Sequence, residues 1–212
     1  MPSNKKITDK RRFSVVIKIT AIVIVMAILI GSTAIYAGYY LHSTTMNQYY
    51  KNQVVNISKT LSKYIPADYI EQLKEAASDP ELETVREEAI ASDNPDLVKD
   101  WMIQKGVYDD YEKVLSILED FRNNMGMTYV YVLNNQANYS TYLADPDEDM
   151  TIFGKREDNT AGFEQYTSNE EIPPTVSEGE YGWLCSGYEP IYSEDGKAIA
   201  LIGVDISMNE VV

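Results

Sequence analysis

Polar side chains occur on one face of each of two strand-like segments. In MTYVYVL, strand alternation places Tyr129 and Tyr131 together, and in AIALIGVDI it places Leu201, Gly203 and Asp205 together. Tyrosine hydroxyls and a carboxylate in an otherwise apolar cleft are groups that orient a small polar ligand. These two faces are therefore predicted to form the walls of a pocket.

Other aromatic residues in strand-like segments complete the candidate site. The predicted ligand-binding residues are Tyr129, Tyr131, Tyr142, Trp183, Tyr188 and Asp205. Each has a structural alternative, because the rings also suit a hydrophobic core and Asp205 also suits the N-cap of a helix beginning at 207–209. A charge-assisted ligand contact would contribute about 1.5 to 3 kcal/mol, and a cap about 1 kcal/mol. Both roles for Asp205 stay open.

The content of cysteine and histidine excludes two common kinds of catalytic site. Cys185 is the only cysteine and His42 the only histidine, and His42 adjoins the apolar N-terminal segment. A Cys-His or Ser-His-Asp site therefore cannot form within the chain. No Walker, G-x-S-x-G, H-E-x-x-H or CxxC pattern occurs. We predict no catalytic residues and no enzymatic activity for these residues, with Cys185 as a small buried hydrophobe.

An acidic loop begins like a calcium site but does not continue as one. Asp145, Asp147 and Asp149 give the D-x-D-x-D start of an EF-hand loop. Its sixth position is Met150 instead of glycine and its twelfth is Arg156 instead of glutamate. We therefore predict no metal ligands and no cofactor. A solvated turn is the default interpretation, and a looser cation site is the alternative.

The N-terminal apolar segment predicts how the site is anchored. Ile19 to Leu41 is a run of 23 residues without a formal charge. As a helix it would span about 34 Å, and the hydrocarbon core of a bilayer is roughly 30 Å thick. Six basic residues precede it, so the positive-inside rule predicts a cytoplasmic N-terminus and an extracytoplasmic location for everything after about His42. The alternative is a secreted protein, cleaved from a signal peptide near Gly31.

Charge is divided unevenly about this segment. The chain has 18 basic and 33 acidic residues, and residues 1–18 hold six of the basic ones and one of the acidic ones. The remainder therefore carries a net charge near −20. Such a field disfavours nucleic acid and anionic lipid as partners and attracts cations or basic ligands. The alternative is that acidity only keeps an exported domain soluble.

A helical stalk is predicted to follow the membrane segment over residues 42–65. Apolar residues recur there at spacings of three and four: Met46, Tyr50, Val54, Ile57, Leu61 and Tyr64. This stripe needs a partner, which is either the sheet of its own domain or a second subunit. We expect a homodimer through the stalk helix.

The remaining pattern predicts an α+β domain with helices first and an antiparallel sheet afterwards. Helices are expected at 68–77, 81–93, 95–105 and 108–124, the second of them as a solvated excursion. Strands are expected at 127–133 and 139–143 as a hairpin, at 181–186 and 188–193 as a strand with a bend, and at 198–206 after an Asp195-Gly196 turn. Residues 144–179 show few regular signals.

The order of these elements resembles the Cache family, the extracytoplasmic PAS-like sensor domains of bacterial transmembrane receptors. The resemblance covers roughly residues 40–207 and is carried by YVYVL, YGWLCSGYEPIYSEDGK and IALIGVDIS. It implies that one face of the sheet packs on the long N-terminal helix and that the other lines a small-molecule pocket. Asp205 matches an aspartate that accepts hydrogen bonds from the ligand amine in amino-acid-binding relatives. Their R-x-W-Y pattern is absent, since Lys155 and Arg156 lack that neighbourhood, and the ligand stays unnamed.

The resemblance implies a small-molecule sensor at the N-terminal end of a membrane signal-transduction receptor. The predicted parts are a cytoplasmic tail at 1–12, a transmembrane helix at 13–41, the stalk at 42–65, the sensor domain at 66–207 and the start of an exit helix at 208–212. A second transmembrane helix and a cytoplasmic output module are expected to follow, with a diguanylate cyclase favoured over a histidine kinase or chemoreceptor. The alternative is a membrane-anchored structural or dimerisation module without a ligand.

Overall fold

The computed structural model describes residues 15–159, 163, 165–179 and 181–209. The chain divides into two units, residues 1–45 and 46–212, and helix α1 (Val15–Tyr64) belongs to both. The predicted cytoplasmic tail lies outside the described residues, as do the last three residues of the predicted exit helix. Met208 and Asn209, which begin that predicted helix, have no helical structure.

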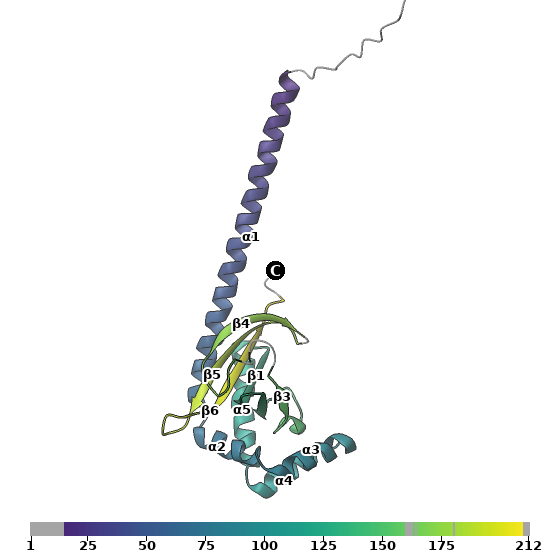
Figure 1. Cartoon of the computed structure of the whole chain (residues 1–212), viewed down its shortest axis with the longest axis vertical. Helices are drawn as coiled ribbons and strands as arrows, with labels where there is room; N and C mark the ends of the chain where they lie inside the picture. Colours follow the sequence, from purple (N-terminus) through teal and green to yellow (C-terminus); the bar gives the residue numbers. More distant parts are fainter. Residues whose placement is uncertain (1–14, 160–162, 164, 180, 210–212) are drawn as a thin grey trace, which may run out of the picture. The chain divides into compact units, whose positions relative to one another are not determined.

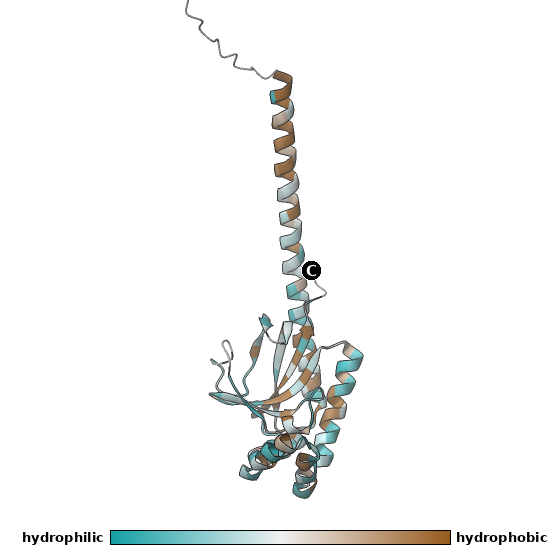
Figure 2. Ribbon diagram, turned by 90° about the vertical axis from the view of Figure 1, so that its right-hand side faces the viewer, coloured by the Kyte–Doolittle hydropathy of each residue, from teal (hydrophilic) through white to brown (hydrophobic). Residues whose placement is uncertain are grey.

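In the first unit, α1 exposes apolar side chains along its length. Residues such as Ile22, Leu29 and Ile35 are 59 to 76% exposed, and Figure 2 shows this part of the helix dominated by hydrophobic residues. By length and composition it is the one helix of the described chain that could cross a membrane. A signal sequence near the N-terminus would meet the same criteria of length and composition, so both interpretations stay open.

The second unit places four helices after α1. They are α2 (Ala67–Ala76), α3 (Pro80–Ser92), α4 (Asp96–Lys105) and α5 (Tyr108–Met125). Both α4 and α5 end at a glycine in the left-handed conformation, with φ of 76° at Gly106 and 67° at Gly126. The amphipathic pattern of α5 buries Tyr111, Val114 and Leu118.

The helix prediction for residues 81–93 is confirmed, but its interpretation as a solvated excursion is wrong. Leu82 and Ala89 are 2% and 1% exposed and belong to the hydrophobic core. Arg86, 6% exposed, donates from Nε to the carbonyl of Thr151 at 2.8 Å and forms an ion pair with Glu83 at 2.8 Å. Glutamates surround these few buried positions in the sequence, which is why the helix reads as polar.

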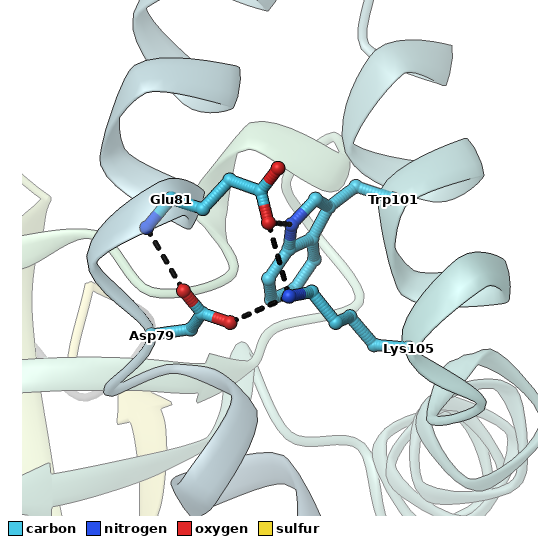
Figure 3. A network of polar contacts seen from close by, with 4 residues as sticks. All are labelled: Asp79, Glu81, Trp101 and Lys105. Atoms are coloured by element: carbon cyan, nitrogen blue, oxygen red, sulfur yellow. Dashed lines mark hydrogen bonds and ion pairs between the residues drawn. The ribbon is translucent and has the colours of Figure 1, made fainter.

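A polar cluster fixes the start of α3 against α4 (Figure 3). The carboxylate of Asp79 accepts from the Glu81 amide at 2.9 Å and from Lys105 Nζ at 2.7 Å. Glu81 in turn accepts from Lys105 at 3.0 Å and from Trp101 Nε1 at 3.3 Å. Asp79 is thus both the N-cap of α3 and one of two anions that hold Lys105.

Replacement of Asp79 is expected to lower stability modestly. Asp79→Ala should lower the melting temperature by a few degrees because it removes the cap and one anion, and Asp79→Asn should lose less because it keeps a capping oxygen. Hydrogen bonds from Lys105 and from the Glu81 amide hold the pKa of Asp79 below its ordinary value. The stabilisation is therefore present above that value and is lost as pH falls through the folded-state pKa. Thermal unfolding at about pH 7 and about pH 3 measures this; an unchanged melting temperature at the higher pH would contradict it.

The sheet has six strands in the order β3-β2-β1-β6-β5-β4, and all neighbours pair antiparallel. They are β1 (Tyr129–Asn135), β2 (Tyr139–Ala144), β3 (Arg156–Asp158), β4 (Ile172–Gly179), β5 (Gly182–Tyr192) and β6 (Ala198–Ser207), with a short helix η1 (Met150–Ile152) before β3. The structure therefore confirms the α+β class, with helices first and the antiparallel sheet second (Figure 1).

Two parts of the strand prediction need correction. Residues 144–179, predicted as irregular, contain β3 and the eight residues of β4. Pro173 and Pro174 conceal β4 in the sequence, and they are tolerated because β4 is an edge strand with a register shift between Ile172 and Thr175. The segment predicted as a strand with a bend is one strand of 11 residues, β5, whose register with β6 shifts between Ile191 and Tyr192.

One face of the sheet packs against the helices. Val130, Val132, Ile202, Val204 and Ile206 belong to the same core as Leu118 of α5 and Val54 and Leu61 of α1. Gly187 on β5 lies against α1, and a Cβ there would meet Val54 Cβ at 2.8 Å and the Val54 backbone at 3.0 Å. Val54 and Leu61, in the middle of the stalk stripe, thus find a partner within their own domain, whereas Tyr64 at its end is 65% exposed.

Candidate ligand-binding site

The other face of the sheet lines a cavity of about 560 Å³. Four residues of the predicted site line it: Tyr131, Tyr142, Tyr188 and Asp205. A second cavity of about 90 Å³ adjoins it and shares Tyr131, Tyr142 and Asp205 as walls. The larger volume falls in the range typical of small-molecule sites, which is about 300 to 1,000 Å³.

Strand register places the predicted residues in two rows across β1, β6 and β5. Tyr131 pairs with Gly203, and Gly203 pairs with Tyr188. The Tyr131 ring lies directly over Gly203, where a Cβ would have no room. The two tyrosine hydroxyls then meet at 3.2 Å. In the next row Asp205 stands between Tyr129 and Ser186.

Asp205 is the most unusual group in the cavity. Its side chain is 4% exposed, and within the described structure Oδ1 has no hydrogen-bond partner. Burial raises the pKa of the carboxyl to about 6, opposed by the nearby hydroxyls of Ser186 and Tyr131 and assisted by the charge of Asp145. The backbone carbonyl accepts from Thr128 at 2.8 Å. Because Asp205 lies within β6, its side chain caps no helix among the described residues.

The tyrosines of the cavity are neutral donors. Burial raises the pKa of Tyr188 to about 12 and raises that of Tyr131 well above its ordinary value. Tyr142 donates to Glu157 at 3.2 Å, and burial followed by the Glu157 charge raises its pKa strongly. All three hydroxyls therefore stay protonated at neutral pH and can hydrogen-bond to a ligand.

The smaller cavity is lined by carboxylates from the acidic loop. Asp145 is 8% exposed, and burial together with the charge of Glu148 raises its pKa to about 6. Lys155 lines the same cavity and is paired with Glu157 at 2.5 Å. Asp147 is paired with Arg122 outside the cavity.

The D-x-D-x-D residues organise turns. Asp145 accepts from the Asp147 amide at 2.9 Å, and Asp149 accepts from the Thr151 amide at 2.8 Å and caps η1. Among the described residues, no group of three metal-ligating side chains is arranged to hold a metal. These hydrogen bonds form turns, as the default interpretation expected, but the turn is not solvated at Asp145, which is 8% exposed.

Two predicted residues lie away from the larger cavity. Tyr129 lines only the smaller one. Trp183 lines neither and packs against the helix-side core. Its neighbours Gly182 and Leu184 face the cavity, so strand alternation turns Trp183 to the opposite face. We leave Trp183 out of the proposed site. Cys185 shares its face and is fully buried, and burial raises the pKa of its thiol to about 11.

Sequence reasoning missed several cavity residues. On β5 the residues Gly182, Leu184 and Ser186 precede Tyr188 at steps of two, and this parity was a usable signal once Tyr188 was a candidate. Glu157 and Glu178 come from β3 and β4, which the sequence did not predict as strands. No signal in the sequence connects them to the site.

Comparison with known proteins finds similarity in structure alone. No protein-family model matches the sequence, and no curated protein matches it. The chain is similar to the sensor domain of DcuS from E. coli, at 14% identity and a TM-score of 0.37 over 72% of this chain and 95% of that one. The ligand-binding domain of the Campylobacter jejuni chemoreceptor Tlp3 with L-valine gives 16% identity and a TM-score of 0.30 over 79% and 64% of the two chains. The same domain with isoleucine bound gives 14% identity and a TM-score of 0.29, over 79% of this chain and 63% of that one.

This chain therefore spans less than two thirds of the Tlp3 domains. The layout that the Cache resemblance implies is present in the chain's own topology. Helices cover one face of an antiparallel sheet, and the opposite face lines a cavity.

Proposed function

We propose that the second unit is a sensor that binds a small organic molecule in the 560 Å³ cavity. The observation that carries this proposal is the buried Oδ1 of Asp205, which has no hydrogen-bond partner among the described residues and lies in a cavity wall. An unsatisfied buried polar group costs about 1 to 3 kcal/mol. A donor on a ligand would remove that cost.

The cavity walls define what such a ligand would contact. Tyr131, Tyr142 and Tyr188 offer rings and neutral hydroxyls. Asp205 on β6 and Ser186 on β5 add polar atoms. Rings that bury apolar surface, together with a few convergent polar groups, are typical of small-molecule sites. Nothing among these side chains forms a nucleophile and base pair, so the proposed role is binding without chemistry.

The cellular arrangement is a proposal of the same kind. We place the sensor outside the membrane, with α1 as an integral anchor and the N-terminus in the cytoplasm, because basic residues precede the apolar segment. A stalk homodimer is supported by Tyr49 and Tyr64, which are 52% and 65% exposed on α1. Light scattering of the purified full chain tests the dimer. The proposed output, a diguanylate cyclase or another module after a second membrane helix, is tested by reading the gene beyond codon 212.

The binding proposal is tested by filling the cavity. The full chain in lipid nanodiscs is screened against a metabolite library by thermal shift, and a ligand at 100 times its dissociation constant should stabilise by about 2.7 kcal/mol. Leu184→Trp places a large ring in the cavity wall and leaves every acidic residue unaltered. It should abolish the thermal shift that the ligand causes. Tyr192→Trp is the matched control, because Tyr192 lies on the same strand, is 54% exposed and lines neither cavity.

The competing function is a structural or dimerisation module without a ligand. It predicts no hit in the screen, and it predicts that Leu184→Trp behaves like Tyr192→Trp. That pair of results would overturn the sensor proposal.

A further inference from the structure

We infer that the ligand is a linear organic dication without a carboxylate, which sets one ammonium at Asp205 in the larger cavity and the other at Asp145 in the smaller one. The inference rests on the proposed function and names its ligand class. It draws on the charges of the two cavities, on two buried carboxylates and on the lack of a free cationic side chain among the described residues of the walls.

The walls of both cavities are strongly acidic. Acidic residues of the larger cavity are Glu157, Asp158, Glu178 and Asp205, and no basic residue is among its described walls. The smaller cavity adds Asp145, Asp147 and Glu148, against Lys155 alone. Facing carboxylates in a confined space repel one another and favour a cationic occupant.

Two of these carboxylates are buried and form no ion pair with any described residue. Asp205 and Asp145 are 4% and 8% exposed, whereas Glu157 and Asp147 each have a cationic partner, in Lys155 and Arg122. The charge of Asp145 is also among the causes that disfavour ionisation of Asp205. Both cavities share Asp205 as a wall, and Asp145 lines the smaller one, so a chain that runs between the cavities reaches both.

The described residues of the walls offer no unpaired cationic partner for a ligand carboxylate. Lys155 is the one basic residue among the described cavity walls, and Glu157 already pairs with it at 2.5 Å. An anionic end would therefore face carboxylates with no positive charge to receive it. An amino acid would bring such an end, whereas a diamine would not.

The aromatic walls favour an organic cation over a metal ion. The rings of Tyr131 and Tyr142 are 6.1 Å apart and those of Tyr131 and Tyr188 are 6.5 Å apart, and all three line the larger cavity. Tyrosine faces attract alkylammonium groups and bury methylene chains. No described group of three metal-ligating side chains accompanies them.

Matched ligands test the inference by calorimetry on the full chain in nanodiscs. The series contains linear diamines from propanediamine to octanediamine, the monoamine of each length, and the amino acid in which a carboxylate replaces one ammonium. The best diamine should bind at least about tenfold more tightly than its monoamine, because it gains a second charge-assisted contact. The matching amino acid should bind more weakly than the monoamine. The inorganic dication Mg²⁺, added as magnesium chloride, should not compete with the diamine for binding.

Variants assign each end of the ligand. Asp145→Asn should weaken the diamine by about tenfold to the level of the monoamine and leave the monoamine unchanged. Asp205→Asn should weaken both. Asp120→Asn, the same charge change at an exposed position of α5 that lines neither cavity, should change nothing.

The failure of this inference is distinct from failure of the proposed function. Equal affinities for diamine and monoamine, or a diamine affinity unaffected by Asp145→Asn, would overturn the dication and leave sensing in place. If a carboxylate-bearing or neutral compound binds, and Leu184→Trp abolishes that binding, the dication is likewise overturned and the sensor proposal stays in place. Absence of any ligand for the native chain would overturn both.

Discussion

Asp205→Asn is expected to stabilise the ligand-free protein by about 1 to 3 kcal/mol at about pH 7.5 and to abolish binding of a cationic ligand. In the folded protein the pKa of Asp205 rises to about 6 from 3.8, which corresponds to at most about 3 kcal/mol at neutral pH. The isosteric amide removes the buried charge and keeps the shape of the side chain. The site is thus expected to cost stability that ligand binding returns.

The sign of the pH dependence follows from that pKa. Because the folded-state pKa lies above the unfolded one, the folded protein binds the proton more tightly, and the penalty is fully present above about pH 6. The native protein should therefore gain stability from this group as pH falls toward about 4, and the advantage of Asp205→Asn should shrink over the same range. Ligand affinity of the native protein should fall in parallel, because protonated Asp205 no longer attracts a cation.

Tryptophan fluorescence can measure this effect in the full chain. Both tryptophans, Trp101 and Trp183, belong to the second unit, so denaturant unfolding followed by fluorescence reports on that unit. Asp120→Asn serves as the control for a change in net charge. A lower stability of Asp205→Asn than of the native chain at about pH 7.5 would show that the carboxylate makes favourable interactions outweighing its burial, and would contradict the prediction.

Gly187→Val is expected to destabilise the second unit by about 3 kcal/mol. A Cβ at this position would meet Val54 Cβ and Cγ2 at 2.8 Å and the Val54 backbone at 3.0 Å. The helix backbone cannot yield as a flexible side chain would, because Val54 and Leu61 hold it in the core at 0% exposure. The substitution therefore forces α1 away from β5 or strains the strand.

Gly179→Val gives a matched comparison for the glycine change. Gly179 lies on the neighbouring strand β4, and nothing stands within 4 Å of a Cβ placed there. Its replacement should leave stability nearly unchanged, since valine suits an extended backbone. If the two variants unfold at the same denaturant concentration, the close packing of α1 on β5 does not carry the expected energy.

The sequence predicted most of the fold where one residue pattern persisted over many positions. Helix α5 shows a clear apolar face, and β6 is an apolar run of which eight residues are buried. The prediction from sequence failed where tertiary context overrides the local residue pattern. Pro173 and Pro174 argue against a strand, and only a partner on one side, with a register shift, makes β4 possible.

The site was predicted in part for a related physical reason. Alternation within β1 and β6 identified Tyr131 and Asp205, because each strand fixes its own parity. Which residues of two neighbouring strands share a face depends on the register between the strands. Ser186 pairs with Asp205 and shares its face, and Trp183, an odd number of residues away on β5, therefore lies on the opposite face. The burial of Asp145 could not be predicted, since it depends on how the loop before β3 packs around the smaller cavity, which local sequence does not specify.

The position of Gly187 has a mechanical consequence. Ser186 and Tyr188, on either side of it, line the cavity, while Gly187 lies so close to Val54 of α1 that a Cβ would not fit between them. Three consecutive residues of β5 thus have the proposed ligand on one side and the stalk helix on the other. Gly187 contributes no side chain of its own at this contact, so a shift of β5 would press its backbone directly on Val54 of α1. In the proposed sensor, Gly187 is therefore a point at which movement of a cavity strand would reach the stalk helix.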